Sequence, residues 1–202
     1  ADGHAAAEPS PSCTSHLCVV DARGNVVSLT QTLLSLFGAK VVLPGSGILV
    51  NNGVMWFDPR PGRVNSMVPG RRPLSNMCPV IAINDAWRLA LGASGGRKIL
   101  PAVLQLLSFM VDYRMPLEAA FAQGRLDVTG DGAVTLHSAL AMAVQQTFRA
   151  EYAAAAVPAD VYPNRFACPV AALADRHTGE QWGTAEVVHP WADAVAAVPR
   201  PA

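Results

Sequence analysis

The chain has 202 residues, with 15 basic and 15 acidic side chains and a hydrophobic content of 51%. This length and composition allow one sizeable apolar core, so a single domain is the default expectation. No basic or acidic block is present, which argues against a nucleic-acid partner and favours a small, near-neutral one. The longest apolar stretch, 99–111, is shorter than the ~20 residues of a membrane span, which predicts a soluble protein without a membrane partner.

The four cysteines, at positions 13, 18, 78 and 168, form no CxxC pair. This spacing predicts buried free thiols rather than a disulfide framework or a metal site, and it favours a reducing compartment. Residues 1–12 have neither the positive start nor the apolar centre of a signal peptide. We therefore expect a cytoplasmic protein, with a periplasmic or secreted location left open because a signal can lie elsewhere in a longer precursor.

Strand and helix patterns alternate along the chain, which predicts an α+β domain with antiparallel sheets. Residues 1–12 are expected to form an exposed linker or tail. The first half is expected to contain a hairpin of strands 17–20 and 26–33, a long loop region over 37–72 with a short strand at 48–50, and a second hairpin of strands 79–83 and 87–91.

The second half begins with a glycine-rich segment, 92–97, which is expected to end the preceding strand. The expected elements after it are helices at 99–111 and 116–123, a weak strand pair within 126–136, a helix at 138–155, a third hairpin of strands 166–174 and 181–188, and a short helix from 190.

Thr14 and Ser15 place a hydroxyl pair directly before an apolar, strand-like run. A threonine in this place can become a nucleophile when the peptide bond before it is cut, because the freed amine then acts as base for the hydroxyl. An ordinary turn or cap is the alternative.

Gly95 and Gly96 precede the expected helix at 99–111. Consecutive glycine N–H groups before a helix can stabilise the oxyanion of an acyl-transfer intermediate, although a simple tight turn has the same sequence. The segment from Arg71 to Met77 combines positive charge and a hydroxyl, which could bind a carboxylate. The histidines have no metal-ligand spacing, so no metal site is expected.

Taken together, these pieces resemble the small catalytic subunit of the γ-glutamyltransferase family of N-terminal nucleophile hydrolases. The matching motifs are Thr14-Ser15-His16, Val19-Val20-Asp21, Gly24-Asn25, Thr30 and Thr32 before Phe37-Gly38, Gly45-Ser46-Gly47-Ile48-Leu49, Asn51-Asn52, Arg72-Pro73-Leu74-Ser75 with Met77 and Pro79, and Gly95-Gly96. The resemblance covers residues 14–202 and implies a four-layer αββα sandwich. It also implies a precursor that cuts itself before Thr14 and keeps both pieces together.

The resemblance implies a role for each matching residue. Thr14 would be the nucleophile of both self-cleavage and acyl transfer, Thr32 would hydrogen-bond it, and the N–H groups of Gly95 and Gly96 would form the oxyanion hole. Ser75 would help to seat a substrate carboxylate. The remaining residues expected to line the substrate site are Asn52, Trp56, Arg72 and Asn76. No metal or organic cofactor is implied.

Departures from the family pattern indicate a different substrate. Leu34, Gly53 and Trp56 stand where classical members have asparagine, glutamine and aspartate to grip the glutamyl α-carboxylate and α-ammonium, and Asn76 replaces a second serine. A lost ammonium partner removes roughly 2 to 5 kcal/mol if buried. The stretch 53–62 resembles a divergent branch that includes oxamate amidohydrolase-like proteins, so we expect a small carboxylate-bearing amide as substrate.

Three alternatives remain. They are a classical γ-glutamyl hydrolase or transpeptidase acting on glutathione-like substrates, a biosynthetic member with another acyl or carbon–carbon cleavage, and a non-catalytic homologue that is never processed. The expected organisation is 1–13 as linker or end of the large subunit and 14–202 as the small catalytic subunit. Its expected partner is the large subunit of the same precursor, with a dimer of these heterodimers left open.

Overall fold

The computed structural model describes residues 13–130, 132–161 and 164–197. The expected linker at 1–12 therefore lies outside the described residues. The chain divides into two compact units, each described here by itself. Unit 1 comprises residues 1–15 and 31–76, and unit 2 comprises residues 16–30 and 77–202.

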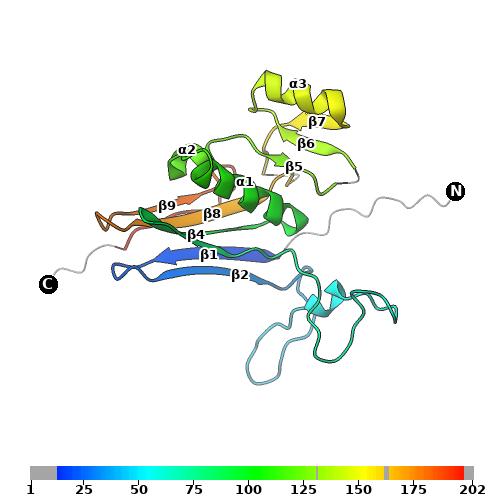
Figure 1. Cartoon of the computed structure of the whole chain (residues 1–202). Coiled ribbons are helices and arrows are strands. Elements are labelled where there is room, and N and C mark those ends of the chain that lie inside the picture. The colour runs from blue at the N-terminus through cyan, green and yellow to red at the C-terminus, as the bar shows by residue number, and fades with distance from the viewer. Residues whose placement is uncertain (1–12, 131, 162–163, 198–202) are drawn as a thin grey trace. The chain divides into compact units, whose positions relative to one another are not determined.

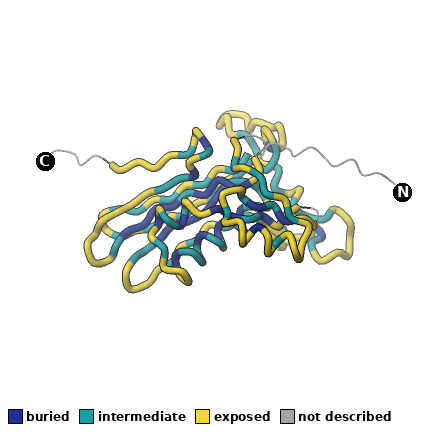
Figure 2. The backbone as a smooth tube through the Cα atoms, turned by 90° about the horizontal axis from the view of Figure 1, so that it is seen from above, coloured by how far each residue is buried: buried dark blue, intermediate teal, exposed yellow. Residues whose placement is uncertain are grey.

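Unit 2 is built around a four-stranded antiparallel sheet of strands β3 (Val80–Ile83), β4 (Trp87–Ser94), β8 (Cys168–Asp175) and β9 (Gln181–Ala185), in the order β3-β4-β8-β9. Helices α1 (Ile99–Val111) and α2 (Leu117–Phe121) lie over one face of this sheet (Figure 1). Figure 2 shows buried residues running along the central strands. The core pairs side chains of α1 at helical spacing, such as Ile99, Val103 and Leu106, with Leu89 and Leu91 of β4.

The hairpin of β1 (Thr14–Val20) and β2 (Val26–Thr32) forms a second, two-stranded sheet. Within unit 2, this hairpin contacts the other face of the four-stranded sheet. The Ser28 hydroxyl donates to the Leu91 carbonyl at 3.0 Å, and the Cys18 thiol donates to the Val170 carbonyl at 3.5 Å. The resulting order of helix, sheet and sheet agrees with three successive layers of the predicted αββα sandwich.

A smaller sheet contains β5 (Leu126–Asp127), β6 (Val134–His137) and β7 (Ala154–Val157). The helix α3 (Met142–Glu151) connects β6 to β7. The predicted helix at 138–155 was wrong at its end, because residues 154–157 form β7, which pairs in parallel with β6. Alanine is a strong helix former, so the pairing with β6 overrides the local helix propensity there.

Three further expectations were wrong. The strand β4 does not end at Gly92, because its pairing with β8 continues to Ser94. The strand expected at 48–50 is only an isolated bridge between Val42 and Leu49. Residues 190–197 form a turn and irregular chain instead of a helix, and the remainder of that segment lies outside the described residues.

The described part of unit 1 is irregular apart from the first residues of β1, the last residues of β2 and a 3-10 helix, η1 (Gly53–Trp56). Among its described residues, only Gly38 and Ser66 are buried, so no buried apolar side chain stabilises it. Its apolar side chains are largely exposed, with Val64 at 94% and Leu74 at 71%. Hydrogen bonds must therefore maintain the conformation of this unit.

Candidate active site

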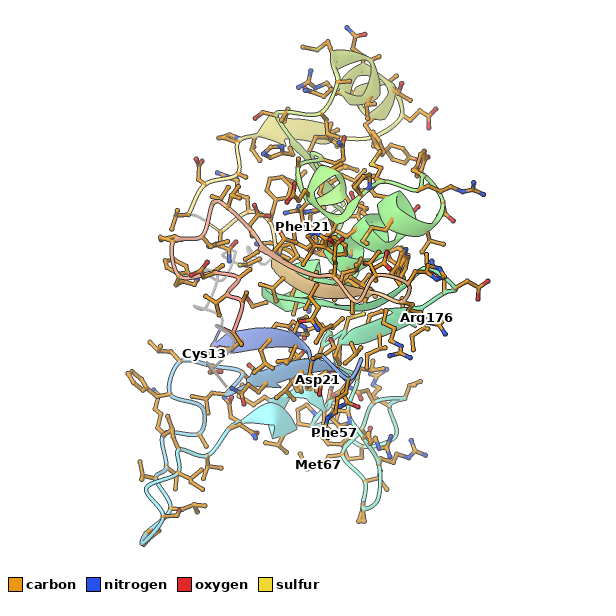
Figure 3. All side chains as sticks on the ribbon, turned by 90° about the vertical axis from the view of Figure 1, so that its left-hand side faces the viewer. Cys13, Asp21, Phe57, Met67, Phe121 and Arg176 are labelled. Atoms are coloured by element: carbon orange, nitrogen blue, oxygen red, sulfur yellow. The ribbon has the colours of Figure 1, made fainter. Side chains whose placement is uncertain are left out.

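Thr14 is the first residue of β1, and Thr32 is the last residue of β2. The Thr14 hydroxyl donates a hydrogen bond to the Thr32 Oγ1 at 3.0 Å, which is the contact that the family resemblance implies. Cys13 and Asp21, which flank the two ends of β1, are labelled in Figure 3. The hairpin geometry therefore brings the two threonines together from positions 18 residues apart.

The segment after Thr32 supports this hydroxyl pair. The Leu34 backbone N–H donates to Thr32 Oγ1 at 2.9 Å, and Leu34 has φ of 72°, which is an uncommon conformation for a residue with a side chain. The Thr32 oxygen thus accepts two hydrogen bonds, which fixes its position relative to Thr14.

Asn52 makes further hydrogen bonds with the segment that follows Thr32. Its Oδ1 accepts from the Ser35 N–H at 3.0 Å, and its Nδ2 donates to the Ser35 hydroxyl at 2.8 Å. The Asn52 backbone N–H donates to the Leu33 carbonyl at 3.1 Å. In this arrangement the Asn52 side chain positions the chain next to Thr32, while its expected contact with substrate remains a prediction.

Trp56 ends the helix η1, which begins directly after Asn52. A Cβ atom at Gly53 would lie 3.6 Å from the Trp56 ring, so the indole packs against this glycine. Thus two of the four departures from the classical pattern, Gly53 and Trp56, are in contact with each other.

The other predicted binding residues lie in an extended irregular segment at the end of unit 1. Arg72 and Ser75 are exposed, and Asn76 is half-buried. All predicted site residues except the two glycines therefore belong to unit 1.

Gly95 and Gly96 lie in unit 2, where Gly95 directly follows β4 and Gly96 begins a 3-10 helix, η2 (Gly96–Lys98), which leads into α1. Their φ angles are 136° and 66°, values that favour glycine. A Cβ at Gly95 would lie 2.8 Å from the Ala167 Cα, so this position excludes any side chain. The backbone turn that the glycine pair predicted is present.

His16 forms a polar network that the sequence did not reveal. Its Nδ1 is 2.7 Å from the Thr30 Oγ1, and its Nε2 is 3.3 Å from both the Cys18 Sγ and the Ser28 Oγ. Because the protons of Cys18 and Ser28 are donated to backbone carbonyls, Nε2 must carry the ring proton and Nδ1 must accept from Thr30. Burial lowers the pKa of His16 to about 4, so the ring is neutral.

Glycine 92 makes room for this imidazole. A Cβ at Gly92 would lie 2.1 Å from the His16 Cε1, closer than any tolerated contact. The alternation of Thr14, His16 and Cys18 along one strand was the available signal for a shared inward face.

The described residues contain no group of three or more His, Cys, Asp or Glu side chains that could hold a metal ion. No disulfide joins the four cysteines, of which only Cys168 is buried. None of the helices in the described ranges has the length and apolar content needed to cross a membrane.

The layered α+β arrangement and the paired threonines point to one class, the N-terminal nucleophile hydrolases. A family model described as Gamma-glutamyltranspeptidase matches residues 1–162. The chain belongs to the gamma-glutamyltranspeptidase family, which confirms the family resemblance, while the likeness to an oxamate amidohydrolase-like branch stays a prediction.

Two curated relatives illustrate the range of the family. The chain is 42% identical over 134 residues to the acylase ACY 1 proenzyme of Pseudomonas sp. strain SE83, covering 66% of this chain and 24% of the relative. It is 40% identical over 117 residues to the glutathione hydrolase proenzyme of Bacillus subtilis subsp. natto, covering 57% of this chain and 20% of the relative. The chain thus spans about a quarter or less of the length of these relatives.

Solved structures show the same fold. A highly active mutant of the gamma-glutamyltranspeptidase of Pseudomonas nitroreducens is 26% identical, with a TM-score of 0.67 over 92% of this chain and 99% of that chain. The cephalosporin acylase of Bacillus halodurans is 21% identical, with a TM-score of 0.72 over 92% of this chain and 34% of that chain. The α+β fold of the N-terminal nucleophile hydrolases is therefore confirmed.

Proposed function

We propose that this chain carries the nucleophile of an amide hydrolase or acyltransferase, and that Thr14 is that nucleophile. The observation that supports the proposal is the ordered pair of Thr14 and Thr32, with the Leu34 N–H as the second donor to Thr32. This arrangement holds the Thr14 hydroxyl at the start of a strand, where cutting of the Cys13–Thr14 bond would free an adjacent amine.

The reaction then follows from acyl-transfer chemistry. The Thr14 amine accepts the hydroxyl proton while Oγ1 attacks the amide carbonyl, and the N–H groups of Gly95 and Gly96 are proposed to stabilise the oxyanion. The amide C–N bond breaks, the leaving amine takes the proton, and an ester on Thr14 remains. Water or an acceptor amine then removes the acyl group.

The substrate is proposed to carry a carboxylate and no α-ammonium. The described part of unit 1 contains five basic residues, Lys40, Arg60, Arg63, Arg71 and Arg72, but a single acidic residue, Asp58. Asp58 is paired with Arg60 at 2.8 Å. The described part of unit 1 therefore has positive charge for an anionic substrate and no unpaired carboxylate to receive an ammonium group.

Oxamate is the simplest amide with these features. A glutaryl amide is a second candidate, because it is a γ-glutamyl amide without the α-ammonium, and because a relative at 42% identity is named an acylase. The large subunit of the same precursor is the proposed partner, since the relatives are named proenzymes.

A matched pair of substrates tests this proposal. Glutaryl p-nitroanilide and γ-glutamyl p-nitroanilide differ only in the ammonium group, and oxamate hydrolysis is followed by ammonia release. We expect the mature protein to turn over oxamate or the glutaryl anilide at least about tenfold faster, as kcat/KM, than the γ-glutamyl anilide. Preference for the γ-glutamyl anilide would instead support the glutathione-hydrolase alternative.

The nucleophile is tested separately by Thr14→Ala. This variant is expected to remain a single uncut species by intact mass and to lose turnover of every substrate, while its circular dichroism and melting temperature stay unchanged. A wild-type protein that keeps the Cys13–Thr14 bond and lacks turnover would support the non-catalytic alternative.

A further inference from the structure

Asn65 connects two parts of unit 1 that the proposed function uses. Its Nδ2 donates to the Trp56 carbonyl at 2.6 Å, and its Oδ1 accepts from the Leu74 N–H at 3.1 Å. An acceptor on one side and a donor on the other fix the orientation of the amide. Trp56 and Leu74 are each nine residues from Asn65, and Leu74 directly precedes Ser75.

The loop that carries Asn65 is itself well fixed. The Asp58 N–H donates to the Asn65 carbonyl at 2.8 Å, and the Met67 N–H donates to the Asp58 carbonyl at 3.3 Å. Phe57, which directly precedes Asp58, and Met67 are both labelled in Figure 3. The backbone of Asn65 is therefore held independently of its side chain.

Ser66 reinforces the same loop. It is 4% exposed, its hydroxyl donates to the Arg60 carbonyl at 2.5 Å, and it accepts from the Arg63 N–H at 2.7 Å. The Asp58–Arg60 ion pair lies in the same loop. These contacts fix the loop, from which the Asn65 amide makes hydrogen bonds with both Trp56 and Leu74.

Buried apolar contacts do not hold the Trp56 and Leu74 segments together in place of Asn65. The neighbouring side chains Met55, Val64, Met67 and Leu74 are all more than half exposed. A side-chain amide with both ends bonded to backbone is the kind of contact that fixes the relative position of two otherwise loose segments.

We propose that Asn65 is a positioning residue that sets the placement of Trp56 relative to the Leu74–Ser75 segment, and that it thereby determines selection against an α-ammonium on the acyl donor. This inference rests on the proposed function and on the family resemblance, which aligns Trp56 with the classical aspartate and implies that Ser75 helps to seat the substrate carboxylate. Asn65 itself touches neither the substrate nor the reacting atoms.

Two substitutions distinguish the hydrogen bond that Asn65 makes with Trp56 from the one that it makes with Leu74. Asn65→Ala removes both hydrogen bonds. Asn65→Asp keeps an oxygen for the Leu74 N–H but presents a carboxylate to the Trp56 carbonyl, so only that contact is lost. The control is Asn84→Ala in unit 2, because the Asn84 amide also makes two hydrogen bonds, to the Ala86 and Trp87 N–H groups, within a turn.

The first readout is hydrogen exchange of the peptide that contains Leu74 in the mature protein. We expect about tenfold faster exchange in Asn65→Ala, and near wild-type exchange in Asn65→Asp and Asn84→Ala. Wild-type exchange in Asn65→Ala would show that the connection is absent and would overturn the inference.

The second readout is the ratio of kcat/KM for the glutaryl and γ-glutamyl anilides. Both Asn65 variants are expected to bring this ratio about tenfold closer to one, mainly through KM, whereas Asn84→Ala should leave it unchanged. A purely structural role for Asn65 would lower both activities equally and leave the ratio as it is, which would also overturn the inference. If the wild type turns over neither anilide nor oxamate, the proposed function and this role both fail, and the exchange data then still report on the connection itself.

Discussion

The oxygen of Thr32 accepts hydrogen bonds from the proposed nucleophile and from a backbone N–H. At the scale of single residues, this double role makes Thr32 the direct support of Thr14. Its removal would leave two donors without their partner, which is more unfavourable than the loss of one ordinary hydrogen bond.

Thr32→Val keeps the shape of the side chain and removes the acceptor. The loss of about 1 to 1.5 kcal/mol of hydrogen bonding should lower kcat about tenfold, while Thr32→Ser should retain most activity. Steady-state rates on the best acyl donor measure the effect. Thr147→Val, which changes an exposed helical hydroxyl, is the control, and equal activities of the Val and Ser variants at position 32 would contradict this role.

His16 should make stability depend on pH. Burial lowers its pKa in the folded protein from 6.5 to about 4, so the unfolded chain binds a proton first as the pH falls. The contribution of the neutral ring is fully present above pH 6.5 and is lost progressively towards pH 4. Melting temperatures of the wild type should therefore fall more steeply over this window than those of His16→Gln, and His177→Gln, at an exposed turn, should behave as the wild type does.

At the scale of elements, β4 continues past the glycine that the sequence analysis took as its end. Its pairing with β8 runs to Ser94, and Gly92 lies within the strand where the His16 ring of the neighbouring sheet approaches the backbone. Glycine here is required by close approach rather than by a turn.

Gly92→Ala tests this contact. The added methyl group should displace the imidazole and destabilise the protein by about 1 to 3 kcal/mol in urea unfolding. Gly130→Ala is a matched control, because the nearest atom to a Cβ there is 3.8 Å away. The double variant Gly92→Ala with His16→Ala should recover part of the loss, and strict additivity would argue against direct contact.

Arg125, just before β5, and Glu186, just after β9, form a buried ion pair, with exposures of 7% and 8%. Arg125→Met leaves Glu186 buried without its partner and should destabilise the protein by about 3 to 5 kcal/mol. Adding Glu186→Leu removes the stranded charge, so the double variant is expected to be more stable than the single one. Equal stability of the two would show that the charges do not interact.

The elements that the sequence predicted well have local signals. The three hairpins were correct because their turns are encoded within a few residues, as in Asp21, whose carboxylate accepts from the Arg23 and Asn25 N–H groups. By contrast, β7 consists mainly of alanine and exists through pairing with β6, about twenty residues earlier, which no local pattern reports.

The candidate site shows the same difference between features that local sequence encodes and features that depend on distant contacts. Thr14, Thr32 and the glycine pair could be named because ordered motifs of a family carried them. Asn65 could not, because its side chain acts on backbone groups nine residues away in each direction, and a single asparagine in a loop has no distinguishing pattern. The proton position on His16 likewise depends on carbonyls supplied by β4 and β8.

At the scale of the whole molecule, the two units are stabilised in different ways. Unit 2 has an apolar core, whereas the described part of unit 1 has polar contacts and exposed apolar side chains. Local opening should therefore be easier in unit 1.

Limited trypsin digestion of the native chain measures this difference. We expect the first cuts after Lys40, Arg63 or Arg71, all in unit 1, because Arg60 and Arg72 precede prolines, and only later cuts in unit 2. Mass spectrometry of early fragments identifies the sites. First cuts after Arg97 or Arg149 would contradict the expected order.

The scarcity of buried apolar surface in unit 1 also affects how it responds to temperature. Opening a segment whose apolar groups already contact water changes the heat capacity little, so the free energy of that opening varies only slowly between cold and warm conditions. The segment that carries the proposed substrate contacts can thus rearrange with nearly constant ease over a wide thermal range, while the layered part of the molecule keeps the sharp melting of a cooperative core.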